Sequence, residues 1–307
     1  MRVAACFPGQ GSQASGMAGS LRDLPLTHRL LEVAAAEGLD LDAVLDAGDD
    51  ALRPTEVAQP ALLLVGVGLF TQLQAATEVA GVAGHSVGEY AALVVAGALE
   101  PGEAMRLVIA RGRAMAAMRE GTMAALLGAD EEVADGVCAE VNASGRGPVV
   151  VANLNAPGQV VLSGSLDGVA AALELARARG VRKAMPLRVS GAFHSPLMAE
   201  AAASVGALID AAPLRDARIP IACNVDGALV TDPEGLRDRL RRQLAAPVRW
   251  TDCVIALTVL GVEALVELGP GGVLTGLAKR IAPGVHAVHA GTAQEAAQLA
   301  QTAVRGG

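Results

Sequence analysis

The first candidate for a reactive residue in this 307-residue chain is a serine that lies between two glycines. In GHSVGEYAALVVAG, residues 84–97, Ser86 stands between Gly84 and Gly88. The five-residue pattern alone also suits a simple tight turn. Here it follows an apolar run, VAGVAG, and precedes a helical stretch, which is the context of a nucleophile elbow. The glycines permit the turn, and the N–H of Val87 at the start of the helix can face a developing oxyanion. We therefore expect Ser86 to be a nucleophile.

A serine hydroxyl needs a base to remove its proton, so the five histidines are the candidates. We favour His194, in SGAFHSPLM, because its loop stands where two parts of the chain are expected to meet. His85 directly precedes Ser86, and we expect it to point away from the serine and to support the turn by hydrogen bonding. The remaining histidines are structural or surface candidates first: His28 on a helical stretch, and His286 and His289 on an apparent strand.

Two further features could complete such a site. The glycine-rich turn FPGQGSQ, residues 7–13, lacks the lysine of a phosphate-binding loop. Gln10 in this turn is well placed to supply a second oxyanion N–H, although a plain turn is the alternative. Arg111 stands on a mainly apolar helical stretch, AMRLVIARGRAM. An arginine there either extends to water or binds an anion, and the residues alone leave that choice open.

Strand-like runs that alternate with helical stretches must position these residues. This order predicts an α/β fold with a parallel sheet covered on both faces. Between residues 123 and 190 the order becomes strand, helix, strand, strand, helix, strand, which is the ferredoxin-like pattern. We expect a large α/β subdomain from residues 1–122 and 191–307, with residues 123–190 inserted as a small subdomain. Ligands tend to bind in the cleft between two such bodies.

The composition limits the function classes. The chain is 52% hydrophobic and 2% aromatic, which predicts a globular protein with a core of small aliphatic side chains. A net charge of −8 argues against nucleic acid or an anionic membrane as a partner. The cysteines are scattered without a CxxC pair, so no metal or redox site is expected. The N-terminus predicts a strand rather than a signal peptide, and the longest apolar run, residues 61–70, is too short for a bilayer. We expect a cytoplasmic protein.

Eight ordered motifs resemble those of malonyl-CoA:acyl carrier protein transacylases and the related acyltransferase domains of polyketide synthases. They cover almost the whole chain: FPGQGSQ, VAQPALL, GHSVGEYAALVVAGAL, RLVIARGRAM, NLNAPGQVVLSG, GAFHSPLM, RRQLAAPVRW and ELGPGGVLTGLAKRI. The resemblance implies an α/β-hydrolase-like large subdomain with a ferredoxin-like insertion. It also implies malonyl-CoA as the substrate, an acyl carrier protein as the partner, and no metal or nucleotide cofactor.

The family's pattern, carried to this sequence, implies a catalytic dyad. Ser86 is the residue that is acylated, and His194 is its general base. The backbone carbonyl of Gln243 orients the histidine. The backbone N–H groups of Gln10 and Val87 form the oxyanion hole. The mechanism implied is ping-pong, with an acyl-serine intermediate between CoA and the carrier.

The same pattern implies selectivity for the malonyl group. Arg111 matches the arginine that binds the free carboxylate of malonyl, which acetyl-CoA lacks. A buried carboxylate needs a charged partner, and a guanidinium can bind it through two hydrogen bonds. Phe193, directly before the histidine, matches malonyl-specific members, so we expect malonyl to be preferred over methylmalonyl.

Docking of an acidic carrier protein on this acidic chain requires a local basic surface. RARGVRK, residues 177–183, and the pair at 279–280 supply candidates, each of which also suits an ordinary solvated helix end. The candidates are Arg177, Arg179, Arg182, Lys183, Lys279 and Arg280.

Other functions stay open at this point. A serine thioesterase or other hydrolase would use the same elbow with His286 or His289 as its base. A non-catalytic docking subunit would keep the fold without the activity, although the intact Ser86, His194 and Arg111 argue against it. Among transferases, the alternatives to the fatty-acid enzyme are a discrete trans-acting acyltransferase of a polyketide synthase and the malonyl-transfer subunit of a malonate decarboxylase. GHSVGEY and AFHSPLM favour the first two of these three.

Overall fold

A six-stranded and a four-stranded sheet organise the computed structural model, which describes residues 1–73 and 77–305. The large sheet consists of β1 (Arg2–Phe7), β2 (Glu78–Gly84), β7 (Ile221–Ala222), β8 (Leu229–Val230), β9 (Ala264–Leu268) and β10 (His286–Ala290). Its strand order is β10-β9-β1-β2-β7-β8, and all its pairs are parallel except β7 with β8. The expected parallel sheet is therefore present, with one antiparallel strand at its edge.

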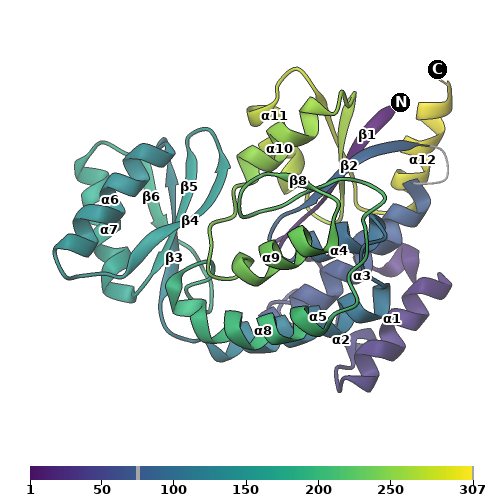
Figure 1. Ribbon diagram of the computed structural model, residues 1–307, viewed down its shortest axis with the longest axis horizontal. Helices are drawn as coiled ribbons and strands as arrows, with labels where there is room; N and C mark the ends of the chain where they lie inside the picture. The colour runs from purple at the N-terminus through teal and green to yellow at the C-terminus, as the bar shows by residue number, and fades with distance from the viewer. Residues whose placement is uncertain (74–76, 306–307) are drawn as a thin grey trace.

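Helices cover both faces of the large sheet (Figure 1). Successive residues of β1 belong to different core clusters: Val3, Ala5 and Phe7 pack on one side, and Ala4 and Cys6 on the other. This alternation is the two-residue period of a strand that is buried on both faces. The helices and 3-10 turns of this part are η1 (Gly19–Leu21), α1 (Pro25–Ala36), α2 (Leu41–Leu45), α3 (Thr55–Leu73), α4 (Gly88–Val95), α5 (Pro101–Ala117), η3 (Pro196–Met198), α8 (Ala199–Ala211), α9 (Pro233–Gln243), α10 (Trp250–Val259), α11 (Val273–Ile281) and α12 (Ala293–Arg305).

Helix α3 differs from the short apolar run that the sequence indicated. It is 19 residues long and, among the described residues, it is the one helix that is long and apolar enough to cross a membrane. In the structure, 83% of its most apolar 18-residue window is buried. Its side chains lie in the core cluster that also contains β1 and α5. Helix α3 is therefore a buried core helix of the large lobe.

The four-stranded sheet forms a separate lobe, on the left in Figure 1. Its elements are β3 (Thr122–Leu127), α6 (Glu131–Ala143), β4 (Val149–Ala156), β5 (Gln159–Gly164), α7 (Leu166–Ala178) and β6 (Lys183–Pro186). The strand order β4-β5-β3-β6, with all pairs antiparallel, is that of a ferredoxin-like unit. This lobe has its own apolar cluster. We therefore retain residues 123–190 as the proposed small subdomain.

The last strand of this lobe is shorter than the sequence indicated. The stretch RKAMPLRVS, residues 182–190, predicts one strand, but β6 spans only Lys183–Pro186. The N–H of Leu187 still donates to the carbonyl of Met123 on β3 at 2.9 Å, and residues 187–190 line the cleft between the lobes.

Backbone hydrogen bonds join the two lobes. The N–H of Leu154 on β4 donates to the carbonyl of Val248 at 2.9 Å, and the N–H of Val248 donates to the carbonyl of Ala152 at 2.8 Å. An ion pair of Arg249 with Glu131, at 2.9 Å, lies beside them. The small lobe is thus fixed to the segment between α9 and α10.

The glycine after the elbow generates a prediction about stability. A Cβ on Gly88 would lie 2.2 Å from the carbonyl oxygen of Phe7, which is a backbone atom of a central strand. We expect Gly88→Ala to lower the free energy of unfolding by about 3 kcal/mol or more, because the strand cannot move aside. In the matched control, Gly206→Ala in α8, a Cβ meets nothing within 4 Å, so we expect no loss or a gain of up to about 1 kcal/mol. Urea denaturation measures both, and equal midpoints would contradict the tight crossing.

Candidate active site

The turn between β2 and α4 holds Ser86 in a strained backbone conformation. Its φ is 52°, in the left-handed region that non-glycine residues seldom adopt. The N–H of Ser86 donates to Oδ1 of Asn224 at 2.7 Å, and Nδ2 of Asn224 donates to the carbonyl of Gly84 at 2.7 Å. Asn224, just after β7, therefore holds the turn on both sides of the serine.

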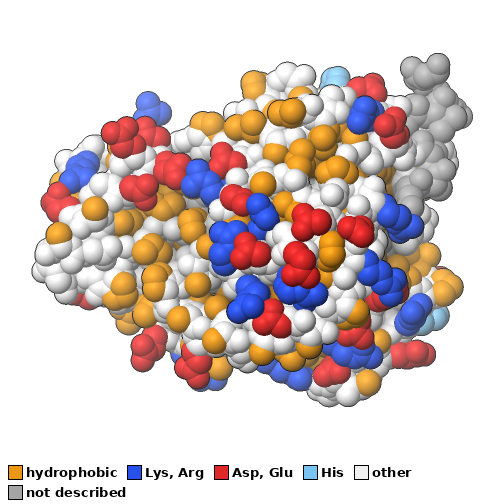
Figure 2. Space-filling view, viewed as in Figure 1, with side chains coloured by type: hydrophobic (Ala, Val, Ile, Leu, Met, Phe, Trp, Pro, Cys, Tyr) orange, Lys and Arg blue, Asp and Glu red, His pale blue; other side chains and the backbone are white. Residues whose placement is uncertain are grey.

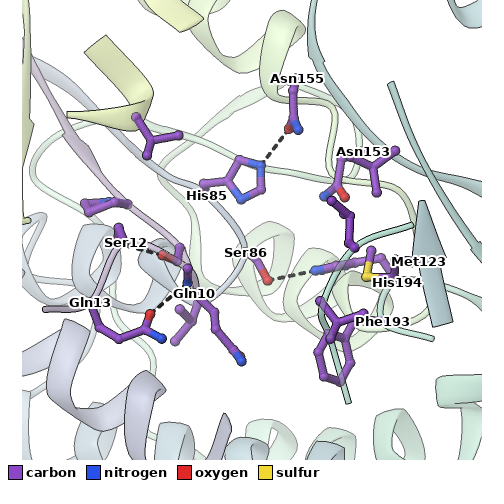
Figure 3. Close-up of a pocket in the computed structure, with 18 of the residues that line it drawn as sticks. Gln10, Ser12, Gln13, His85, Ser86, Met123, Asn153, Asn155, Phe193 and His194 are labelled. Atoms are coloured by element: carbon purple, nitrogen blue, oxygen red, sulfur yellow. Dashed lines mark hydrogen bonds between the residues drawn. The ribbon is translucent and has the colours of Figure 1, made fainter. Parts of the chain in front are cut away.

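The structure brings His194 against the serine hydroxyl. Ser86 Oγ and His194 Nε2 are 2.7 Å apart (Figure 3). On the other side of the ring, Nδ1 lies 3.0 Å from the carbonyl oxygen of Gln243 and 3.2 Å from that of Ala246. Because carbonyl oxygens only accept, Nδ1 carries the proton and Nε2 keeps a lone pair for the serine proton. Carbonyl oxygens thus stand where a Ser-His-Asp triad has its carboxylate.

The protonation state of His194 suits a general base. The side chain is 4% exposed, and this burial, together with the positive charge of Arg111, lowers the pKa of His194 to about 3. The imidazole is therefore neutral at physiological pH, as proton abstraction requires.

Arg111, on α5, is a buried cation beside the same hydroxyl. Its side chain is 1% exposed. Nη1 donates to Oε1 of Gln59 at 2.6 Å, while Nη2 donates to Ser86 Oγ at 3.0 Å and to Oε1 of Gln243 at 3.1 Å. The guanidinium also lies 5.7 Å from the ring centroid of Tyr90, and its Nε has no hydrogen-bond partner in the part of the chain that the structure describes. Within residues 1–73 and 77–305 it forms no ion pair with a carboxylate, so it can bind an anion next to the hydroxyl of Ser86.

These side chains open into a cleft of about 980 Å³ between the lobes. Residues 8–13 and the first turns of α11 line it on the large lobe, and Asn153 and Val161 line it on the small lobe. Phe193, which is 7% exposed, also lines the cleft directly before His194. The cleft is where the sequence placed a ligand site.

The two expected oxyanion donors belong to neighbouring loops at the cleft. Gln10 lines the cleft, and its side chain accepts a hydrogen bond from the hydroxyl of Thr55. Val87 is the N-cap of α4 and lines the cleft directly after Ser86. The next three N–H groups, those of residues 88–90, donate to the carbonyls of residues 85–87. A Cβ on Gly9 would lie 2.7 Å from the carbonyl of His85, so the two loops are in close contact.

His85 is placed differently from our expectation. Its Nε2 bonds to Oδ1 of Asn155 at 2.9 Å, on β4 of the small lobe (Figure 3). Its ring centroid lies 5.6 Å from that of Trp250. The ring therefore links the two lobes instead of supporting the serine turn. Burial lowers the pKa of His85, which keeps this link neutral.

The other histidines lie outside the site. His28 is exposed on α1, and His286 is exposed on β10. His289 Nε2 bonds to the carbonyl of Gly269 at 2.6 Å. None of the three is among the described residues that line the cleft with Ser86.

Three residues of the site were not predicted from the sequence. Asn224 holds the elbow and Gln59 holds Arg111, as described above. Glu89, 2% exposed on α4, accepts hydrogen bonds from Gln243 Nε2 at 2.9 Å and from the N–H of Asn224 at 3.1 Å. The available signal was a lone carboxyl at the start of the apolar stretch GEYAALVV and a lone amide in the apolar VAQPALL.

The candidate docking residues fall into two groups. Arg177 donates to the carbonyl of Ala184, Arg179 pairs with Glu140, and Arg280 donates to Gln159 and Pro157, so these three are held by their own chain. The exposed residues with no such partner in the described part of the chain are Arg182, Lys183 and Lys279. Figure 2 shows acidic and basic side chains intermixed over one face, in keeping with the need for a local patch.

The described residues contain no cluster of side chains suited to bind a metal ion. Over residues 1–73 and 77–305, no group of three or more His, Cys, Asp and Glu side chains is placed to hold a metal ion. The four cysteines are buried and unbridged.

A nucleophile elbow on a parallel sheet, a serine paired with a neutral histidine, and a buried arginine beside the hydroxyl define an acyl-transferring serine enzyme. The acyl transferase domain model matches residues 6–300, and the chain belongs to the acyl transferase family. The resemblance drawn from the eight motifs and the expected fold class are both confirmed.

Similar proteins share both sequence and structure with this chain. A malonyl CoA-acyl carrier protein transacylase of Bacillus subtilis is 40% identical over 288 residues, which are 91% of this chain and 90% of that protein. The crystal structure of a malonyl-CoA:acyl carrier protein transacylase of Xanthomonas oryzae has a TM-score of 0.90 and 40% identity over 98% of each chain. A malonyl-transacylase in complex with a type II polyketide synthase acyl-carrier protein has a TM-score of 0.91 and 36% identity, covering 98% of this chain and 100% of that one.

The histidines provide a test of the dyad. We expect Ser86→Ala and His194→Ala each to lower the rate of enzyme acylation by about a thousandfold or more. The first variant removes the hydroxyl that would be acylated, and the second removes its base. The matched control His286→Ala removes an exposed histidine and is expected to leave the rate within about twofold. Stopped-flow release of CoA measures all three, and a severe loss in His286→Ala with an active His194→Ala would point to a hydrolase-type triad.

Proposed function

We propose that this protein transfers a malonyl group from CoA to the phosphopantetheine thiol of an acyl carrier protein. Ser86 Oγ attacks the thioester carbonyl, and His194 Nε2 takes the hydroxyl proton and passes it to the departing CoA sulfur. The carrier thiol then gives its proton to His194 and attacks the serine ester. The serine is released with its proton restored, and the malonyl thioester stays on the carrier.

The single observation that carries this proposal is the position of Arg111. Its Nη2 lies 3.0 Å from the nucleophilic oxygen, and the guanidinium is buried without a carboxylate partner in the described structure. A malonyl group on Ser86 Oγ extends one methylene beyond the ester carbonyl, which brings its carboxylate to this guanidinium. An acetyl group would leave the guanidinium without a carboxylate in direct contact. The relatives named above as malonyl transacylases support the same choice of acyl group.

The remaining contacts of the acyl group are assigned by the same proposal. The backbone N–H groups of Gln10 and Val87 donate to the oxyanion that forms at the thioester carbonyl. The carbonyl of Gln243 keeps His194 in the tautomer that the reaction needs. Phe193 forms the wall against which the α-carbon of the acyl group would pack, and this disfavours a methyl branch.

The proposal requires no cofactor beyond the substrate malonyl-CoA. It places the protein in the cytoplasm, since buried, unbridged cysteines suit a reducing compartment. It applies to carriers of fatty-acid or polyketide synthesis alike, because the reaction uses only the phosphopantetheine arm and the acidic surface that such carriers share.

A basic edge beside the cleft is the proposed docking surface. A Cβ on Gly128 would lie 3.4 Å from Arg182, and a Cβ on Gly158 would lie within 4.0 Å of both Gly128 and Arg280. Arg182 and Arg280 thus flank one continuous stretch of surface. Gln159, which binds Arg280, lines the cleft, so this stretch adjoins the opening. The docking residues proposed are Arg182, Lys183, Lys279 and Arg280, whereas Arg177 and Arg179 are bound to Ala184 and Glu140.

Intact-mass measurement tests the function directly. We expect malonyl-CoA to place one malonyl group on Ser86, and a holo acyl carrier protein to remove it as its own thioester. We expect Arg111→Ala to lower kcat/KM for malonyl-CoA by about a hundredfold or more while leaving acetyl-CoA unchanged or better, because only malonyl uses the guanidinium.

The control for this test lies on the same helix. Arg113→Ala removes an exposed arginine that binds the carbonyl of Glu37, and we expect it to leave both substrates unaffected. Free malonate without carrier product would contradict transfer and favour the hydrolase. The absence of any adduct would favour a docking subunit.

Charge reversal tests the docking surface. We expect Arg182→Glu combined with Lys183→Glu to raise KM for the carrier roughly tenfold, and less at high salt, without altering CoA release. Arg29→Glu, an exposed change on α1, is the control for altered net charge. Equal effects of the two changes would argue against a local docking patch.

A further inference from the structure

A buried carboxyl group that the proposed reaction does not use lies one side chain away from Arg111. Oε2 of Glu89 accepts the Nε2–H of Gln243 at 2.9 Å. Oε1 of the same Gln243 accepts Nη2–H of Arg111 at 3.1 Å. One amide therefore bridges a carboxyl and a guanidinium that do not contact each other directly.

The charges of this arrangement change when a malonyl group enters. In the empty site, burial lowers the pKa of Arg111, and Glu89 is the carboxyl whose charge acts in the opposite direction and stabilises the protonated guanidinium. A malonyl carboxylate adds a second negative charge, so that two buried anions share one cation. An uncompensated buried charge is strongly unfavourable. The malonyl carboxylate meets the guanidinium directly, whereas Glu89 reaches it only through an amide. Glu89 is accordingly the group that becomes neutral.

Glu89 can be protonated without loss of its contacts. Both of its donors, Gln243 Nε2 and the N–H of Asn224, bind the same oxygen, Oε2. A proton on Oε1 leaves both hydrogen bonds in place. Burial raises the pKa of Glu89 to about 7, while the two hydrogen bonds and the charge of Arg111 act in the opposite direction. The carboxyl thus changes its charge near neutral pH.

Several titratable or charged groups surround Glu89. They lie on its own helix, on α5, on α10 and around β7: Tyr90, Arg111, Cys253, Cys223 and Asp226. Burial raises the pKa of Tyr90 to about 12 and raises the pKa of both thiols. Asp226 is held in an ion pair with Arg239 at 2.9 Å. His194, with its pKa lowered to about 3, is already neutral.

We propose that Glu89 balances the charge of Arg111 in the empty site and takes up a proton from solvent when a malonyl group is loaded on Ser86. The proposal rests on the proposed function. Acylation itself exchanges a thioester for an ester and a thiol, and it consumes no proton while the CoA thiol stays protonated. The extra proton therefore goes to Glu89 Oε1. Glu89 acts through Gln243 and Arg111, as a residue that determines specificity by charge without touching the acyl group.

The direction of the pH dependence follows from linkage. Malonylation favours the protonated carboxyl, so the pKa of Glu89 rises in the acyl-enzyme. Below pH 7 the carboxyl is protonated before and after acylation, and kcat/KM for malonyl-CoA is constant. Above pH 7 each acylation must take up a proton, so kcat/KM falls about tenfold per pH unit. Acetyl-CoA, which brings no carboxylate, is expected to show no such decline.

The decisive experiment counts protons in the wild-type protein. Malonylation is run without carrier at pH 7.5 in two buffers of different ionisation enthalpy, and the heat is normalised to the adduct seen by intact mass. We expect an uptake of roughly three-quarters of a proton per adduct, the fraction of a carboxyl of pKa about 7 that is ionised at this pH. This measurement needs no variant, so it does not depend on the folding of one.

Glu89→Gln tests the residue itself. It keeps an acceptor oxygen for both donors and cannot titrate, so we expect no proton uptake and a flat kcat/KM from pH 6 to 8.5. The exposed change Glu234→Gln is the matched control and should behave as wild type. A malonylated wild type without proton uptake, or a Glu89→Gln profile equal to that of wild type, would overturn this proposal and leave the transferase intact. Absence of the malonyl adduct would overturn the proposed function and, with it, the role of Glu89.

Discussion

The contact on which the site depends is the crossing of the serine turn over the end of β1. Phe7 pairs with Gly84 in the sheet, and its carbonyl accepts the N–H of His85 at 2.9 Å while leaving no room for a Cβ on Gly88. This approach forces the chain to reverse within a few residues, which places Ser86 at a positive φ. It also brings the turn after β1 against the turn after β2, so that the two loops that carry the proposed oxyanion donors are in close contact. The position of the hydroxyl is thus a property of the sheet.

The buried charge of Arg111 is the second constraint, and it acts on more than substrate binding. In the free protein that charge contributes, after burial, to the low pKa of His194. A base with a low pKa accepts a proton reluctantly. In the proposed function, a malonyl carboxylate on the guanidinium offsets its charge and so makes His194 a stronger base. In the proposed reaction, the substrate that binds best is therefore also the one that activates the nucleophile, whereas an acetyl group does neither.

Local features of the sequence were sufficient to predict the elements that carry the site. The spacing of the glycines around Ser86, the strand before it and the helix after it are encoded within about twenty residues. The ferredoxin-like order of residues 123–190 was likewise readable, because each strand and helix has its own periodicity. The base was found by the place of its loop between two subdomains, and the roles of Gln243 and Phe193 came only from the family resemblance.

The contacts that could not be predicted from the sequence join residues that are far apart along the chain. Asn224 reaches the serine turn from a loop 138 positions away, and His85 meets Asn155 across 70 positions. No periodicity encodes such pairs, because they are set by the tertiary packing of segments far apart in the chain, within the large lobe for Asn224 and between the lobes for His85. The burial of Glu89 was hidden for the same reason, since its partner Gln243 lies 154 positions away. The length of helix α3 was also not predicted. The apolar run of residues 61–70 indicates only part of this helix, which spans Thr55–Leu73.

The two-lobed arrangement suits transfer better than hydrolysis. CoA and a carrier protein present the same phosphopantetheine arm, so one cleft can receive the donor and then the acceptor at the same serine. The backbone bonds at Val248 and the link between His85 and Asn155 fix the width of that cleft. Between the two events the acyl-serine must resist water. In the proposed reaction, a malonyl group paired with Arg111 fills the space beside the ester and leaves less room for water. The pairing that is proposed to select the acyl group would therefore also protect it until the carrier thiol arrives.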